Sequence, residues 1–354
     1  MPCTQLPGCA VTAAMAFDTL LAVIGALLAW TTLRDVFDTV VVPGGSRASL
    51  RVAQRLGSVL LLVWKAVRGR RRGISGTFAP VVLLGSFLIW LALLGLAFGL
   101  MAYAARSQFQ PRLESLPEAI FTVGSAMTTI GPGKAESVMG VGRWILLAAS
   151  FCGLAVVTMA VTYFLQVQSS IGARDTGIIK LNTSAGEPPS ALTLLERFAA
   201  LRNRAEVRDV LAEARNWCAT VRQSHSAHPT LIYFQSVGIG AGWPAALGAI
   251  MDLALLAEHV IDDDSLYGPA ILLRNEGLRM ARDLSGTAGI KPVEASADEA
   301  ELKQAANRLT SSGYPARADI GFGAMATQRS QYCAYINALA AHLGKPSAVL
   351  VRQG

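Results

Sequence analysis

The sequence predicts an all-α membrane protein, in which three transmembrane helices precede a helical cytoplasmic domain. Of its 354 residues, 52% are hydrophobic and only 16% are charged, whereas about a quarter of a typical soluble domain is charged. Three apolar runs are long enough to cross a bilayer, and the C-terminal half shows no run of alternating strand residues. The predicted parts are a tail with the first span (1–42), a basic segment (43–77), a central membrane domain (78–171) and a cytoplasmic domain (172–354).

Each of the three apolar runs is predicted to cross the membrane once. They are 11–33, 78–105 and 144–167. The hydrocarbon core of a bilayer is about 30 Å thick and takes about 20 helical residues to cross. The second and third runs contain no charged residue, whereas the first carries Asp18 near one end.

A basic segment between the first two spans sets the predicted orientation. Between Gly44 and Thr77 there are eight basic residues and no acidic one, so the rest of the chain is close to neutral. Short basic loops stay in the cytoplasm. We therefore expect a protein of the cell (inner) membrane that has its N-terminus outside and residues 172–354 in the cytoplasm. We expect an amphipathic helix here, with residues 47–72 facing anionic lipid headgroups, and no nucleic acid as a partner.

A short helix and an extended loop are predicted between the second and third spans. Pro117 suits the first turn of a helix, and the apolar run 119–127 provides roughly three turns, too few to cross a bilayer. The sequence Gly131-Pro132-Gly133 then ends the helix. Such backbone occurs at membrane depth only where it is buried in protein or lines a watery path. The segment is therefore predicted to be a re-entrant loop.

Residues 117–153 resemble the pore region of the potassium-channel superfamily without a gap. The resemblance covers 37 residues directly, or 78–168 with the flanking spans. Pro117 and Ala119 match the start of the pore helix. The filter is matched by Thr128-Thr129-Ile130-Gly131 and Gly133. Gly142-Arg143 match the start of the inner helix, and Gly153 matches the point at which that helix flexes.

The resemblance implies a homotetrameric channel with an outer helix at 78–105, a pore helix and filter at 115–134, and an inner helix at 142–168. The first span and the cytoplasmic domain are additions to this core. Backbone carbonyls would replace the water around a monovalent cation, K⁺ above all, and no other cofactor or metal is expected. Residues of the ion path would be Thr128, Thr129, Ile130, Gly131, Pro132 and Gly133.

Two residues depart from the family pattern at the outer end of this filter. Pro132 stands where the family has a tyrosine, and Lys134 stands where it has an aspartate. The pore-helix positions that would support the tyrosine are Phe121 and Thr122. Proline removes a backbone donor, and a ring of four lysines would repel cations at an outer mouth that also holds Glu136.

These departures leave alternatives open. Gly-Pro-Gly-Lys also suits a plain type II turn, and Lys134 also suits a harmless, solvated position. The protein could be a non-conducting scaffold or sensor that keeps a channel fold and acts through its cytoplasmic domain. It could equally be a channel of unusual, even anion, selectivity set by the lysine ring.

The cytoplasmic domain carries weaker signals, and its ligand or protein partner is not indicated. Residues 236–243, SVGIGAGW, depart from the dinucleotide-binding spacing, and the apolar stretch 231–251 is predicted to be a buried turn and helix instead of a fourth span. His225 and His228 are interpreted as capping or packing residues. No pairing of a nucleophile with a base stands out, so an enzyme is not expected.

Overall fold

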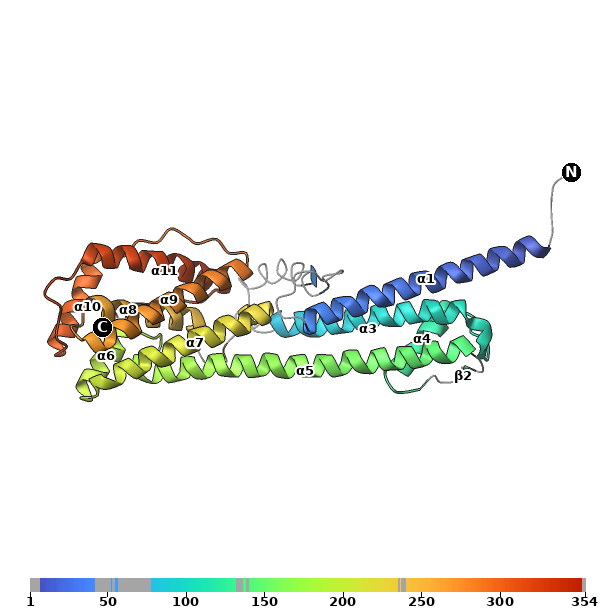
Figure 1. The fold of residues 1–354 in the computed structure, drawn as a ribbon, viewed down its shortest axis with the longest axis horizontal. Coiled ribbons are helices and arrows are strands. Elements are labelled where there is room, and N and C mark those ends of the chain that lie inside the picture. The colour runs from blue at the N-terminus through green and yellow to red at the C-terminus, as the bar shows by residue number, and fades with distance from the viewer. Residues whose placement is uncertain are drawn as a thin grey trace. The chain divides into compact units, whose positions relative to one another are not determined.

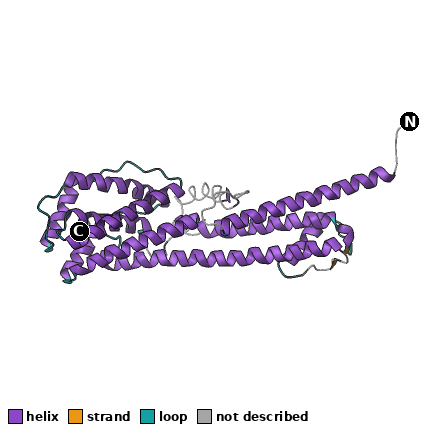
Figure 2. Cartoon of the chain, viewed as in Figure 1, coloured by secondary structure: helices purple, strands orange, loops and turns teal. Residues whose placement is uncertain are grey.

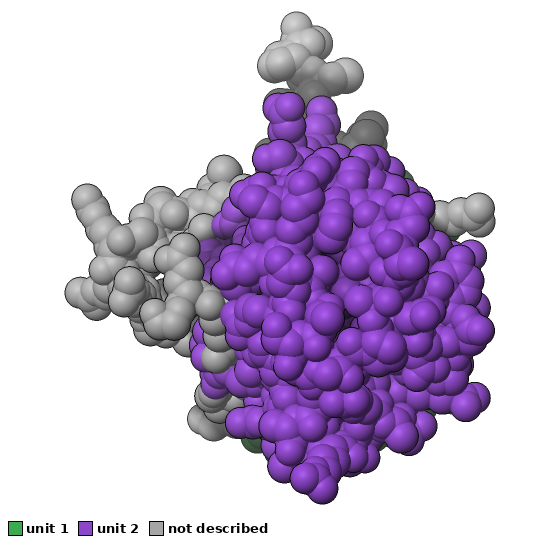
Figure 3. All heavy atoms as spheres, turned by 90° about the vertical axis from the view of Figure 1, so that its left-hand side faces the viewer, with its two compact units in different colours: residues 1–166 green, residues 167–354 purple. Residues whose placement is uncertain are grey.

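The computed structural model describes residues 7–41, 52, 55–56, 78–131, 136–137, 140–234, 236 and 240–351. Within these residues nearly all regular structure is helical, as Figure 2 shows. The chain forms two compact units, Met1–Gln166 and Val167–Gly354. Figure 3 looks onto the closely packed surface of the second unit. The all-α prediction is confirmed.

Figure 1 shows the α-helices of the first unit whose bounds the structure describes. They are α1 (Pro7–Val40), α3 (Phe78–Ala104), α4 (Leu116–Met127) and the first part of α5 (Gly140–Ala185). Of the described helices, α1, α3 and α5 are long and apolar enough to cross a membrane. The prediction of three membrane-crossing helices is confirmed at that level.

Helix α1 runs antiparallel to α3, and two polar contacts, one near each end of α1, fix how the two helices are aligned. Near the start of α1, the Asp18 carboxylate lies 2.5 Å from the Arg106 guanidinium, just beyond the end of α3. Near the end of α1, the buried Asp35 accepts a hydrogen bond of 2.8 Å from the Trp90 indole. A buried carboxylate needs such donors because desolvation penalises its charge.

Helix α5 is longer than the predicted inner helix, because it runs unbroken for 46 residues to Ala185. Nothing between 168 and 185 stops a helix, since this stretch contains no proline. The stop follows at Gly186, whose φ is +77°, and at Pro188. Left-handed glycine is a common helix terminator, and proline cannot continue a helix.

A short ladder that the sequence did not predict brackets α4. A 3₁₀ turn, η2 (Arg106–Gln108), leads into β1 (Phe109–Gln110), which pairs antiparallel with β2 (Glu136–Ser137). The loop containing α4 is therefore closed at its base. A further contact joins the turn before β1 to the start of α5, where the Gln108 carboxamide accepts a hydrogen bond of 3.0 Å from the Gly142 amide.

The second unit is a helical bundle built around α8 (Gly242–His259), which is buried from Gly242 to Glu258. Four helices pack against it. They are α6 (Ala191–Ala200), α7 (Val207–Ala227), α9 (Asp264–Thr287) and α11 (Phe322–Leu343). The remaining elements are η3 (Arg204–Glu206), η4 (Pro229–Tyr233) and α10 (Glu299–Ser311). The described residues of the uncharged stretch 231–251 thus form a turn and a core helix, as predicted.

Helix α8 carries the charged residue Asp252 inside this bundle. Asp252 is buried and accepts hydrogen bonds from the Arg329 guanidinium at 3.0 Å and from the Tyr332 hydroxyl at 2.5 Å, both on α11. Arg329 also donates to the Glu301 carboxylate of α10 at 2.8 Å. Burial of a carboxylate is tolerated when it is paired and hydrogen-bonded in this way.

Candidate functional site

The start of α4 is capped by a side chain, and Pro117 lies in its first turn as predicted. The Ser115 hydroxyl accepts a hydrogen bond of 3.4 Å from the Glu118 amide. The Glu118 carboxylate accepts a second bond of 2.7 Å from the Glu114 amide. Together they satisfy amides at the positive end of the helix, where an acid is favourable.

The body of α4 packs closely against α3 at one glycine. A Cβ placed on Gly99 would lie 2.5 Å from Cγ1 of Ile120, so only glycine allows this approach. Gly95, four residues earlier on the same helix, has nothing within 4 Å of such a Cβ. Of the two predicted filter-support positions on α4, Thr122 is buried whereas Phe121 is 70% exposed.

The end of α4 rests on α5 at Gly153. A Cβ placed on Gly153 would lie 2.6 Å from the carbonyl oxygen of Met127 and 2.8 Å from its Cβ. Sequence reasoning assigned Gly153 a flexing role. In this structure it lies within an unbroken helix, and the missing side chain makes room for the C-terminal end of α4.

The residues after α4 form a tight turn directly at its C-terminus. The Thr128 hydroxyl donates to the carbonyl of Gly124 at 2.9 Å. The amides of Ile130 and Gly131 both donate to the carbonyl of Ser125, at 3.0 Å and 3.1 Å. Ile130 itself is 83% exposed.

Positive φ angles alternate through this turn. Thr129 has φ of +62° and Gly131 has φ of +99°. Glycine adopts such angles freely, but a β-branched residue at φ > 0 is an outlier of the kind that concentrates at functional sites. The partial negative charge of the α4 C-terminus lies at the same place, which favours a cation there.

The outer half of the predicted filter lies outside the described residues. This holds for Pro132, Gly133 and Lys134, and for most of the basic segment 43–77. Their predicted roles therefore stay predictions. Glu136, predicted at the outer mouth, lies in β2 opposite Gln110.

Two carboxylates of α1 that have partners in the structure, Asp18 and Asp35, were missed as contact residues. The sequence showed Asp18 only as a charge in the first span, and Asp35 was not singled out. The signal available was the expected antiparallel course of spans one and two, which brings Asp18 to the level of Arg106. Nothing in the sequence singled out Trp90 as the donor to Asp35.

His225 and His228 in the second unit fit the predicted packing role. Nδ1 of His225 lies 2.8 Å from the carbonyl of Val221, which makes it the protonated nitrogen of a neutral ring. Burial lowers the pKa of His225 to about 3, and the nearby Arg174 adds to this effect. The pKa of His228 is lowered by burial as well. Among the described residues, no group of three His, Cys, Asp or Glu side chains could hold a metal ion.

Comparison of the chain with protein-family models, with curated proteins and with solved structures found no match. Function is therefore argued from the geometry around α4 and from the resemblance of residues 117–153.

Proposed function

We propose that this protein is a tetrameric channel for monovalent cations, with a filter of backbone carbonyls that begins at Thr129. One chain would supply a quarter of the ring, so four copies around a common axis are required. The proposal rests on the pore-like sequence of residues 117–153.

The observation that carries the proposal is the setting of α4. It is a capped, three-turn helix held between two long apolar helices by close contacts at Gly99 and Gly153. A short helix in a membrane domain, with a turn of alternating φ at its end, has no role in spanning a bilayer. Such a helix can instead direct its C-terminus, and the backbone carbonyls that follow it, toward a cation path.

Exposed apolar side chains support an assembly of several copies in a membrane. Ile130 at the turn and Phe121 on α4 are mostly exposed in the single chain. Helix α5 adds a face of large exposed residues: Trp144, Leu147, Phe151 and Leu154. Lipid and neighbouring copies would cover such surface, which would otherwise meet water.

Selectivity is proposed to be weaker than in potassium channels, because Pro132 and Lys134 replace the tyrosine and aspartate of the family. The Lys134 ring would raise the energy of a cation at the mouth. The anion-selective alternative depends on the same ring. Lys134→Asp separates the two: it would raise cation flux in a cation channel and reverse the ion preference in an anion channel.

Flux from liposomes tests the proposal. Protein shown to be tetrameric is reconstituted, and efflux of K⁺, Na⁺ and Cl⁻ is measured separately. The proposal predicts cation efflux that exceeds Cl⁻ efflux. An intact tetramer without any ion flux, with flux restored only by Pro132→Tyr with Lys134→Asp, would support the non-conducting scaffold instead.

A further inference from the structure

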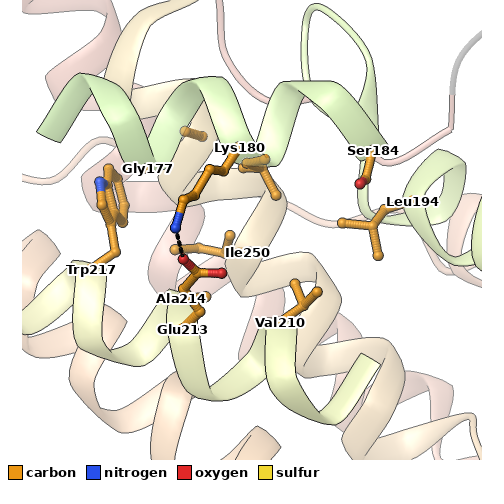
Figure 4. Close-up of a pocket in the computed structure, with 11 residues that line it drawn as sticks. Gly177, Lys180, Ser184, Leu194, Val210, Glu213, Ala214, Trp217 and Ile250 are labelled. Atoms are coloured by element: carbon orange, nitrogen blue, oxygen red, sulfur yellow. Dashed lines mark hydrogen bonds and ion pairs between the residues drawn. The ribbon is translucent and has the colours of Figure 1, made fainter. Parts of the chain in front are cut away.

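Two helices of the second unit present matching faces to each other around a cavity (Figure 4). Helix α5 contributes Gly177, Lys180, Leu181 and Ser184, and α7 contributes Val210, Glu213, Ala214 and Trp217. Both sets have the i, i+3, i+4, i+7 spacing of a single helix face. The remaining lining residues are Leu194 of α6 and Ala246 and Ile250 of α8.

The faces touch at one end of the cavity and stay apart over the rest. At the closed end the Trp217 ring lies against the backbone of Gly177, where a Cβ would come within 2.0 Å of it, and its indole donates to the carbonyl of Arg174 at 2.9 Å. Ala214 and Ser184 are too small to fill the space beyond. A cavity of about 70 Å³ is left.

The size and lining of this cavity suit a short aliphatic group. A single water needs roughly 10 to 15 Å³ measured in this way, so the space accepts about five small groups. Leu194, Ala246 and Ile250 are buried and offer water no hydrogen-bond partner. An apolar occupant is therefore favoured over water.

An ion pair bridges the mouth of the cavity. The Lys180 ammonium donates to the Glu213 carboxylate, and Figure 4 shows the pair reaching across from the two helices. Both side chains are about three-fifths exposed, at 61% and 60%. An exposed pair of this kind contributes little to the stability of a protein, so a ligand can displace it at little cost.

We propose that this cavity binds a small aliphatic α-amino acid. Its side chain would fill the apolar space, its carboxylate would pair with Lys180 and its ammonium with Glu213. A simple anion or cation would satisfy only one of the two mouth charges and leave the other without its partner. A zwitterion satisfies both, and this charge complementarity selects the ligand class.

Binding at this place would act on the membrane helix, a consequence that rests on the proposed channel function. The α5 face that lines the cavity belongs to the same unbroken helix that carries Gly153. A ligand held between α5 and α7 would restrain the cytoplasmic end of that helix. Binding itself does not depend on whether the protein conducts ions.

The test uses four probes that share one branched tail and differ in the charge of the head. They are leucine, 3-methylbutanoate, 3-methylbutylamine and 3-methylbutan-1-ol. Binding to the full chain in detergent is measured by calorimetry, with the rise in melting temperature as a second readout. We expect leucine to bind about tenfold more tightly than each of the other three.

Variants locate the binding. Ala214→Leu and Ser184→Leu each fill the cavity from a different helix and should abolish leucine binding. Lys180→Met with Glu213→Gln should remove the preference for leucine over the alcohol. The matched control is Lys303→Met with Glu299→Gln, which removes a similarly exposed ion pair on α10 and should leave binding unchanged.

Three outcomes would overturn the site: no leucine binding, binding of the alcohol as tight as that of leucine, or leucine binding that survives in a folded cavity-filled variant. Ion flux is measured separately on the same preparations. Leucine binding without ion flux would refute the proposed channel function and support the binding site. Ion flux without leucine binding would support the channel function and refute the binding site.

Discussion

Gly153 lies so close to Met127 that a Cβ on the glycine would stand 2.6 Å from the carbonyl oxygen of the methionine. This contact joins the end of the short helix α4 to the long helix α5. The carbonyl belongs to the C-terminal end of α4, where the negative end of the helix dipole lies. The contact therefore fixes where the proposed cation path begins.

Gly153→Ala should destabilise the protein, because the new methyl group overlaps backbone that has little room to move. Overpacking of this kind costs about 1 to 3 kcal/mol. Flux in liposomes should fall as well, since Met127 and the turn after it would shift. The unfolding free energy in mixed detergent micelles is the measurement.

The control for this variant lies in the same helix. A Cβ on Gly172 would meet nothing within 4 Å, so Gly172→Ala should leave stability unchanged or raise it by up to about 1 kcal/mol, as helix propensity predicts. Equal effects at the two glycines would contradict the packing role of Gly153.

Asp18 and Arg106 should show a favourable coupling energy. They pair at 2.5 Å where α1 and α3 meet, and both side chains are mostly buried. In a double-mutant cycle with Asp18→Asn and Arg106→Gln, we expect a coupling of about 1 to 2 kcal/mol in unfolding free energy. Additive single effects would show that the ion pair does not hold these helices together.

Asp252→Ala should destabilise the second unit strongly. It removes the partner of the Arg329 guanidinium and of the Tyr332 hydroxyl inside the bundle. Breaking a buried pair costs about 3 to 5 kcal/mol. Tyr332→Phe removes one hydrogen bond only, and should cost about 1 to 3 kcal/mol.

Denaturant unfolding of the full chain, followed by a spectroscopic signal from the helices of the second unit, measures these two losses. If Asp252→Ala destabilised the protein no more than Tyr332→Phe does, the ion pair would not contribute beyond the hydroxyl contact.

Acidification should destabilise the second unit through His225. Its pKa is lowered by burial to about 3, whereas an unfolded histidine titrates near 6.5. Below pH 6.5 the unfolded chain binds a proton that the folded chain does not, so stability present above pH 6.5 is lost as pH falls toward 3. The slope from this residue approaches about 1.4 kcal/mol per pH unit.

Comparing His225→Phe with the parent chain between pH 4 and 7 measures this contribution. The variant should show a smaller slope of unfolding free energy against pH, and Ser226→Ala, an exposed change on the same helix, should not. An unchanged slope in His225→Phe would mean that the ring does not stay neutral in the fold.

Much of the fold could be predicted from the sequence, because its signals are local. Apolar length indicated the three long helices, and Pro117 indicated the start of α4. The extension of α5 to Ala185 was missed because the end of the apolar run was interpreted as the end of the helix. Polar residues continue a helix until Gly186 ends it.

Less of the site could be predicted, because its contacts depend on tertiary packing. The pairing of β1 with β2 involves two residues on each strand, too few to form a pattern. The approach of Gly153 to Met127 joins two helices and has no local signature. The cavity between α5 and α7 follows from the particular placement of Gly177 beside Trp217.

Current through planar bilayers is the most direct test of the central claim, that the turn after α4 begins a cation path. The reconstituted protein is placed between two concentrations of KCl and the reversal potential is recorded. A cation channel predicts a reversal potential shifted toward the equilibrium potential of K⁺, with the current reduced in Gly153→Ala. A reversal potential on the chloride side, or no current from an intact tetramer, would contradict it.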